Sequence, residues 1–418
     1  MSKLLFKKGM HFSRTPVFIL MLSSAVAQVL NLFVTAYLSR YYPAEAFGIW
    51  AIFQTTAVIL AIVSTGRYEF AIMLPQEEKK AKSIVRLALN LSIFFSIIIG
   101  IIVCLPFTKI AINYFEKVQL ITQYLYLLSI AIFCYACFQI FSYWYIRKQN
   151  YKLLAFQRIF ETVVIGIICL LFIHDGIKGL VLGNIAGIAC SACLFLGIYY
   201  WQRNGDSLIS MRRIAKEYVD FPINNILQAV IEILQFNIIT FSTTFLYGTD
   251  MAGYYAIGLR ILQAPAMLLV RPIAQVYFID ITNAYHKNES LTVVNQQVMK
   301  RVFTFLLPII FGLLFFASLF FSIFFGENWR TSGVIIQLLC LWFLVDFIRV
   351  PLTQLAVLYR RQTGLLLFSI IGILLTITIS LIAYFCQIQW QYYFAAITIA
   401  QIIFTLINIR WLLLLKRK

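Results

Sequence analysis

Residues 302–325 read VFTFLLPIIFGLLFFASLFFSIFF, a run without a charged side chain that follows directly after Lys300 and Arg301. A helix rises 1.5 Å per residue, so this run is about 36 Å long, more than the roughly 30 Å hydrocarbon core of a bilayer. Comparable apolar runs tile the rest of the chain. The sequence therefore predicts twelve transmembrane helices, at 17–38, 44–65, 87–108, 120–146, 153–173, 178–200, 221–246, 252–280, 302–325, 331–358, 364–386 and 391–414.

The composition agrees with a membrane protein. Of the 418 residues, 62% are hydrophobic and only 12% are charged, and the mean hydropathy is +0.87. Soluble domains are about half apolar and a quarter charged. The net charge of +18 is also typical of nucleic-acid-binding proteins, but here Lys and Arg lie at the ends of the apolar runs rather than on one patch. We therefore expect no nucleic-acid partner.

The charged loops predict the orientation. Basic residues are concentrated in alternate loops, for example at Lys79, Lys80 and Lys82, and at Arg212 and Arg213, whereas the loops between them hold few. By the positive-inside rule both termini are cytoplasmic. The first run is too long for a signal peptide and lacks a small-residue cleavage site, so we expect it to be retained.

The cysteines and histidines indicate no metal or redox site. Cys134 with Cys137, and Cys190 with Cys193, have CxxC spacing, but both pairs lie in apolar helices without further ligands. Cysteine there is expected to pack as a small hydrophobe. The three histidines are isolated. We expect no bound cofactor.

One polar segment, 201–220, divides the chain into six predicted spans on each side. This predicts an N-terminal lobe at 1–200, a cytoplasmic linker at 201–220 and a C-terminal lobe at 221–418. Within the linker, apolar residues alternate with basic ones over 207–219, as in a short amphipathic helix that lies on an anionic membrane surface.

The two halves resemble each other. The residues EAFGIWAI from Glu45 match DMAGYYAI from Asp250 at a shift of 205, with acid, glycine, aromatic and alanine in register. Because each half has an even number of spans, both enter the membrane from the same side. The sequence therefore predicts parallel repeats about an axis along the membrane normal.

Several spans carry polar residues at helical spacing, which places them on one face. Unpaired polar groups in hydrocarbon are costly, so such faces meet other helices or water. The faces are Ser24, Gln28, Asn31 and Thr35; Asn225, Gln228, Glu232 and Gln235; Arg260, Gln263, Arg271 and Gln275; and Asp346, Arg349 and Thr353.

Two interpretations of these faces stay open. In one, the polar groups join helices to each other. In the other, spans one, seven and eight line a central aqueous cleft, and its arginines bind an anion such as phosphate through paired hydrogen bonds. Asp346 and Arg349 can neutralise each other locally. Glu232 either pairs with an arginine or is buried enough to carry a proton.

Three segments resemble the polysaccharide-exporter branch of the multidrug/oligosaccharidyl-lipid/polysaccharide (MOP) superfamily, and specifically its O-antigen flippases. They are RYEFAIMLP from Arg67 to Pro75, YVDFP from Tyr218 to Pro222, and GYYAIGLRILQAP from Gly253 to Pro265. The length and the six-plus-six layout are also similar over essentially the whole chain.

The resemblance implies an all-α integral membrane fold, with twelve helices in two six-helix lobes around a V-shaped, cationic central cleft. It implies a flippase of the bacterial inner membrane that moves undecaprenyl-diphosphate-linked oligosaccharide from the cytoplasmic to the periplasmic face by alternating access. A polysaccharide polymerase and a chain-length regulator are the implied partners, and a proton or sodium gradient is a possible drive. Arg67, Glu69, Arg260 and Arg271 take candidate roles, although Glu69 can also simply pair with Arg67.

The candidate substrate-binding residues are thus Arg260, Arg271, Arg349, Arg67, Gln28, Asn31, Gln228 and Gln263, and the candidate coupling carboxylates are Glu232, Asp346 and Glu69. A multidrug or cation antiporter of the same superfamily is the alternative, but it would favour acids over arginines. A membrane oligosaccharide polymerase would need catalytic outer loops, and the predicted outer loops are short. We expect a transporter rather than an enzyme.

Overall fold

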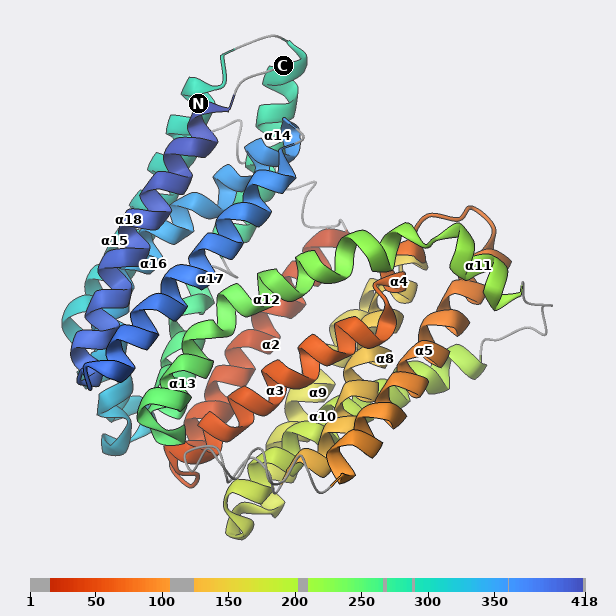
Figure 1. The fold of residues 1–418 in the computed structure, drawn as a ribbon, viewed down its shortest axis with the longest axis horizontal. Coiled ribbons are helices and arrows are strands. Elements are labelled where there is room, and N and C mark those ends of the chain that lie inside the picture. Colours follow the sequence, from red (N-terminus) through yellow and green to blue (C-terminus); the bar gives the residue numbers. More distant parts are fainter. Residues whose placement is uncertain are drawn as a thin grey trace. The chain divides into compact units, whose positions relative to one another are not determined.

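The computed structural model describes residues 16–105, 124–201, 210–265, 269–287, 290–359 and 361–415; the side chains of 16–25 and of Asn224, Phe236, Pro265, Arg271, Gln275 and His286 lie outside the description. The described residues form helices joined by turns, with no strand among them (Figure 1). In chain order the elements are α2 (Pro16–Leu38), α3 (Ala44–Thr65), α4 (Tyr68–Ala71), α5 (Glu78–Cys104), η2 (Leu125–Leu127), α8 (Leu128–Arg147), α9 (Tyr151–Leu171), η3 (Ile173–Asp175), α10 (Ile177–Trp201), α11 (Met211–Glu217), α12 (Asp220–Tyr247), α13 (Thr249–Pro265), α14 (Arg271–His286), α15 (Thr292–Phe325), η5 (Glu327–Trp329), α16 (Arg330–Leu358), α17 (Gln362–Phe385) and α18 (Trp390–Leu414).

The chain is a multi-pass membrane protein. Within the described ranges, nine helices are long and apolar enough to cross a bilayer: α3, α5, α8 with η2, α9, α10, α15, α16 with η5, α17 and α18. Helix α12 joins them if its two parts, Asp220–Gln235 and Asn237–Tyr247, form one span. Helix α2 coincides with the first predicted span. Its part with described side chains, Val26–Leu38, is apolar but too short to cross a bilayer alone. The total of twelve spans stays a prediction.

The chain divides into two compact units, Met1–Ile233 and Leu234–Lys418, with the boundary inside α12. In the first unit, α8 packs on α3, α5 and α10, and α9 packs on α10. In the second unit, α16 packs on α13, α15 and α18, and α17 packs on α18. Helices α3 and α13 begin at Ala44 and Thr249, which is the shift at which the sequence repeats. The same packing pairs recur in each unit, which supports the internal repeat.

The continuity of the eighth predicted span, 252–280, stays a prediction. Helix α13 ends at Pro265 and α14 begins at Arg271, while residues 266–268 lie outside the description. Proline lacks an N–H and clashes with the preceding turn, but it fits the first turn of a helix, where Pro272 stands. Arg260 lies on α13 and Arg271 begins α14, and their predicted alignment on one helical face also stays a prediction.

The predicted linker helix is present as α11, although it is shorter than predicted and residues 207–209 lie outside the description. Its Ile214 is completely buried in the apolar core formed with α5, α8 and α10. The Tyr68 hydroxyl donates to the Ala215 carbonyl at 3.3 Å, and Lys80 forms an ion pair with Glu217. The apolar side of α11 thus contacts the first unit itself rather than lipid.

Candidate functional site

A strained turn after α3 presents Arg67. Gly66 and Arg67 both have left-handed backbones, with φ of 61° and 58°. Glycine adopts this conformation freely, but for any other residue it costs about 1–2 kcal/mol. The Arg67 N–H donates to the Thr65 hydroxyl at 3.3 Å, which helps to hold the turn. The turn fixes where the arginine leaves the backbone.

Arg147, at the end of α8, holds the chain that follows this turn. Its guanidinium donates to the carbonyls of Ile72 at 3.1 Å, of Met73 at 3.4 Å and of Gln76 at 3.3 Å. A planar guanidinium can satisfy several carbonyls that no helix pairs. Arg147 is therefore a positioning residue that connects α8 to the segment between α4 and α5.

Arg67 and Glu69 form a buried ion pair at 3.3 Å, with side chains that are 18% and 1% exposed. The Arg67 guanidinium also lies 4.5 Å from the centre of the Phe70 ring. In the described part of the chain, Arg67 Nε and Glu69 Oε2 are buried without a hydrogen-bond partner. Both charged groups therefore keep an unused hydrogen-bonding position.

The carboxyl of Glu69 lies in α4, outside the candidate membrane spans. Burial raises the pKa of Glu69 above its usual value, and the hydrogen bond with Thr65 and the charge of Arg67 oppose this only in part. A carboxylate that is costly to keep charged takes up a proton more readily. Protonation would leave the positive charge of Arg67 uncompensated.

Next to this pair is a pocket of about 370 Å³ within the first unit. Gln228 donates to Glu232 at 3.0 Å across one turn of α12. Gln228 is half-buried and Glu232 is exposed. The pocket thus combines one guanidinium, two amides, one carboxylate and aromatic rings, and its lining residues are Arg67, Phe70, Phe221, Asn225, Gln228, Ala229 and Glu232.

The second unit has a smaller, more enclosed polar pocket. Arg349 Nε donates to Asp346 at 2.7 Å, so the local pairing that their spacing allowed is present. Asn408 and Trp342 also line this pocket. Within the described part of the chain, Asn408 Oδ1 and Trp342 Nε1 are buried without a hydrogen-bond partner. The volume of about 40 Å³ holds only a few waters, too few for a sugar. The full lining is Gln235, Ile239, Tyr255, Leu259, Gln263, Trp342, Phe343, Asp346, Arg349, Gln401, Phe404, Thr405 and Asn408.

Of the other predicted site residues, Gln28, Asn31 and Arg260 line neither pocket in the described part of the chain. Gln28 and Asn31 are half-buried on α2, where Asn31 accepts a hydrogen bond from Thr35 at 3.2 Å. Arg260 is half-buried on α13. Arg271 begins α14, and its side chain lies outside the description. A single cleft lined by spans one, seven and eight stays a prediction.

Sequence reasoning missed Glu161. It lies near the middle of α9, and Gln157, which is only 1% exposed, donates to its Oε2 at 2.6 Å. Ionisable residues inside spans are rare and often functional. The signal was available, because Gln157 and Glu161 stand one helical turn apart, with Arg158 between them, inside the predicted span 153–173.

The described residues define an all-helical membrane protein with a polar pocket in each of its two units. The family described as "Polysaccharide biosynthesis protein" matches residues 37–333, and the chain belongs to it. No curated protein matches the chain.

Solved structures show the same fold. A multidrug-resistance transporter of the MATE family and MOP superfamily, in an inward-facing conformation, superposes with a TM-score of 0.72 at 15% identity, covering 94% of this chain and 97% of the other. The lipid II flippase MurJ, in an inward closed conformation, gives 0.73 at 16% identity, with 94% and 87% covered. A MOP superfamily transporter from Pyrococcus furiosus, whose binding pocket is described as having reverse polarity, superposes with a TM-score of 0.63 at 14% identity. The superposition covers 94% of this chain and 93% of the other. These neighbours are transporters and a flippase, not enzymes.

Proposed function

We propose that this protein is a flippase that moves polyprenyl-diphosphate-linked oligosaccharide units, such as O-antigen repeats, from the cytoplasmic to the periplasmic face of the inner membrane. Alternating access of the two units is the proposed mechanism. Membership of the polysaccharide biosynthesis family supports a glycan cargo. The likeness to a lipid II flippase supports a fold able to carry a lipid-linked one.

The observation that carries the proposal is the Arg67 pocket. A lipid diphosphate needs a cation with free hydrogen-bond donors, and Arg67 Nε is buried without a partner in the described chain. The sugar hydroxyls need donors and acceptors, which Asn225 and Gln228 offer. Both arginines have a carboxylate partner, Glu69 for Arg67 and Asp346 for Arg349, but the Arg349 pocket, at about 40 Å³, holds only a few waters. We therefore assign the diphosphate to Arg67 and give the second pocket a supporting role.

Glu69 provides a route for coupling to a proton gradient. When Glu69 is charged it competes with the diphosphate for Arg67, and when it is protonated the arginine is free. Sodium coupling and a role for Glu232, Asp346 or Glu161 are alternatives within the same proposal.

The test is export of surface polysaccharide by Arg67→Ala and Arg67→Lys, at equal membrane levels of protein. We expect the alanine variant to lose export and the lysine variant to retain part of it, because lysine keeps the charge but not the two-pronged hydrogen bonding. Arg40→Ala, at an exposed loop position, is the matched control. Normal export by Arg67→Ala would remove Arg67 from the site.

A multidrug or cation antiporter is the second candidate, because Glu232 lines the same pocket and MATE transporters share the fold. The two functions separate by their cargo. Loss of drug resistance with normal surface glycan would favour the antiporter.

A further inference from the structure

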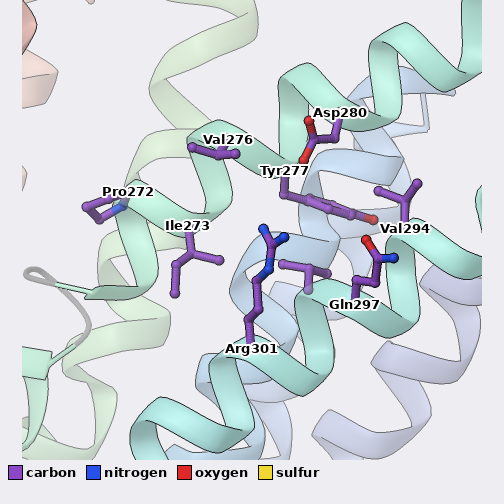
Figure 2. A pocket seen from close by; sticks show the side chains of 9 residues that line it. Pro272, Ile273, Val276, Tyr277, Asp280, Val294, Gln297 and Arg301 are labelled. Atoms are coloured by element: carbon purple, nitrogen blue, oxygen red, sulfur yellow. The ribbon is translucent and has the colours of Figure 1, made fainter. Parts of the chain in front are cut away.

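The second unit has a further pocket, near one edge of the predicted membrane region. It contains two oppositely charged residues, Asp280 and Arg301, that do not form an ion pair with each other. It lies between α14 and the first turns of α15, has a volume of about 200 Å³ and is lined by Pro272, Ile273, Val276, Tyr277, Asp280, Val294, Gln297, Val298 and Arg301. Figure 2 shows the Arg301 guanidinium directed into the pocket from α15 and Asp280 on α14, with the Tyr277 side chain between them in this view. Neither pocket of the preceding sections includes these residues.

The position of the pocket along α15 places it at the edge of the bilayer. The charge-free run begins at Val302, directly after Arg301, and is long enough to fill the hydrocarbon core by itself. Residues 292–301, which provide the α15 side of the pocket, therefore lie at the headgroup level. By the predicted orientation this is the cytoplasmic face.

The two charged side chains are available to a ligand. Asp280 and Arg301 are exposed, and the described residues place no partner within ion-pair distance of either. The Tyr277 hydroxyl, in contrast, is occupied, since it donates to Asn295 at 2.7 Å and braces α14 on α15. The Tyr277–Asn295 hydrogen bond therefore holds the two helices of the pocket together, while the charged groups of Arg301 and Asp280 are exposed to solvent.

The walls are apolar. Pro272, Ile273 and Val276 on α14 and Val294 and Val298 on α15 line the pocket, and Val276 is 47% exposed. A wholly aqueous ligand would gain nothing from these surfaces, whereas the glycerol and upper acyl chain of a lipid would bury them. Apolar walls with polar groups at the headgroup level match an amphiphile.

We propose that this pocket binds a zwitterionic phosphoethanolamine lipid, with Arg301 on its phosphate and Asp280 on its ammonium. An anionic lipid would satisfy Arg301 but would be repelled by Asp280. A phosphocholine lipid has no N–H to donate to the carboxylate. The pair of charges thus selects for a headgroup that contains both a phosphate and a primary ammonium. The proposal does not depend on the flippase function.

The test is native mass spectrometry of the purified protein with phosphatidylethanolamine, phosphatidylglycerol and phosphatidylcholine of identical acyl chains. We expect the wild type to retain phosphatidylethanolamine about tenfold or more better than the other two, the effect of one charge-assisted hydrogen bond. Arg301→Gln should lose this specific binding for all three. Asp280→Asn should keep binding but lose the preference over phosphatidylglycerol.

Matched controls separate this pocket from lipid bound elsewhere. Lys300→Gln removes the adjacent positive charge on the same helix, and Glu327→Gln removes an exposed carboxylate at the other end of α15. Both should behave as wild type. Equal retention of the three lipids by wild type, or an unchanged preference in Asp280→Asn, would overturn the proposal. Displacement of the lipid by soluble phosphoethanolamine at equal concentration would show a headgroup site with no lipid requirement, and would also overturn it.

Discussion

At the scale of single residues, the left-handed turn at Gly66 and Arg67 positions the candidate cation. Gly66→Ala should destabilise the protein by about 1–2 kcal/mol, because alanine is strained at φ of 61°. Its added Cβ would also lie 3.1 Å from the Tyr68 ring. A lower thermal unfolding temperature together with reduced export is the expected outcome.

Gly197→Ala is the control for this prediction. Gly197 lies within α10, where an added Cβ would meet no atom within 4 Å. Alanine there is expected to be neutral or slightly stabilising, because it has the higher helix propensity. Equal effects of the two substitutions would argue against strain at Gly66.

Glu69 predicts a pH dependence of stability. Its pKa is raised in the folded protein above the usual 4.5, so the cost of the buried charge is fully present above the folded pKa. This cost falls as the pH drops through the folded pKa, and it is absent below the unfolded value. Unfolding temperatures of wild type and Glu69→Gln in detergent, measured from pH 7 to pH 4, test this. The variant should lack the part of the stability gain that the wild type shows on acidification.

The same group predicts how anion binding changes with pH. Protonated Glu69 leaves Arg67 free, so as the pH falls diphosphate binding by wild type should strengthen relative to that by Glu69→Gln, in which only the protonation of the diphosphate itself changes. Titration of pyrophosphate against the purified proteins measures this. Equal pH profiles for the two proteins would exclude Glu69 from coupling.

The sequence indicated these residues but not their environments. The Arg67–Glu69 pair was visible as a local possibility, because only two positions separate the residues. The depth of Glu69, at 1% side-chain exposure, depends on how the turn packs in the first unit, which no local pattern contains. Glu161 was visible in the sequence, with Gln157 four and Arg158 three residues before it, and was overlooked because it belongs to none of the polar faces considered.

At the scale of secondary-structure elements, Arg147 connects α8 with the segment after α4. Arg147→Met should destabilise the first unit by about 1–3 kcal/mol, since three carbonyls lose their donors. Arg147→Lys should recover only part of this, because a single ammonium cannot reach all three. Lys152→Met, at an exposed position on α9, serves as the control in the same thermal unfolding assay.

Element positions followed closely from the apolar runs, whereas polar extensions did not. Helix α5 begins at Glu78 although its predicted span began at 87, because a hydropathy pattern detects only the part that lies in lipid. Residues 266–268, between α13 and α14, lie outside the described part of the chain, so the continuity of the eighth span stays a prediction. Proline alone does not predict a break, because Pro308 lies inside α15 and Pro351 lies inside α16.

At the scale of the whole molecule, the two units repeat one pattern of helix packing but differ in their polar pockets. Each unit pairs its arginine with a carboxylate, but within the described residues Arg67 also keeps a buried Nε without a hydrogen-bond partner, and its pocket has about 370 Å³ against about 40 Å³ around Arg349. The repeat was readable at Glu45 and Asp250, whose helices α3 and α13 begin in register. The functional difference was not, because it depends on which groups meet in three dimensions.

The most direct test of the central claim is deletion of the gene, followed by extraction of polyprenyl-diphosphate-linked glycans and an assay of the leaflet that holds them. Flipping by this protein predicts full-length repeat units trapped on the cytoplasmic face, with export restored by wild type but not by Arg67→Ala. Lipid-linked units that still reach the periplasmic face in the deletion strain would contradict the account.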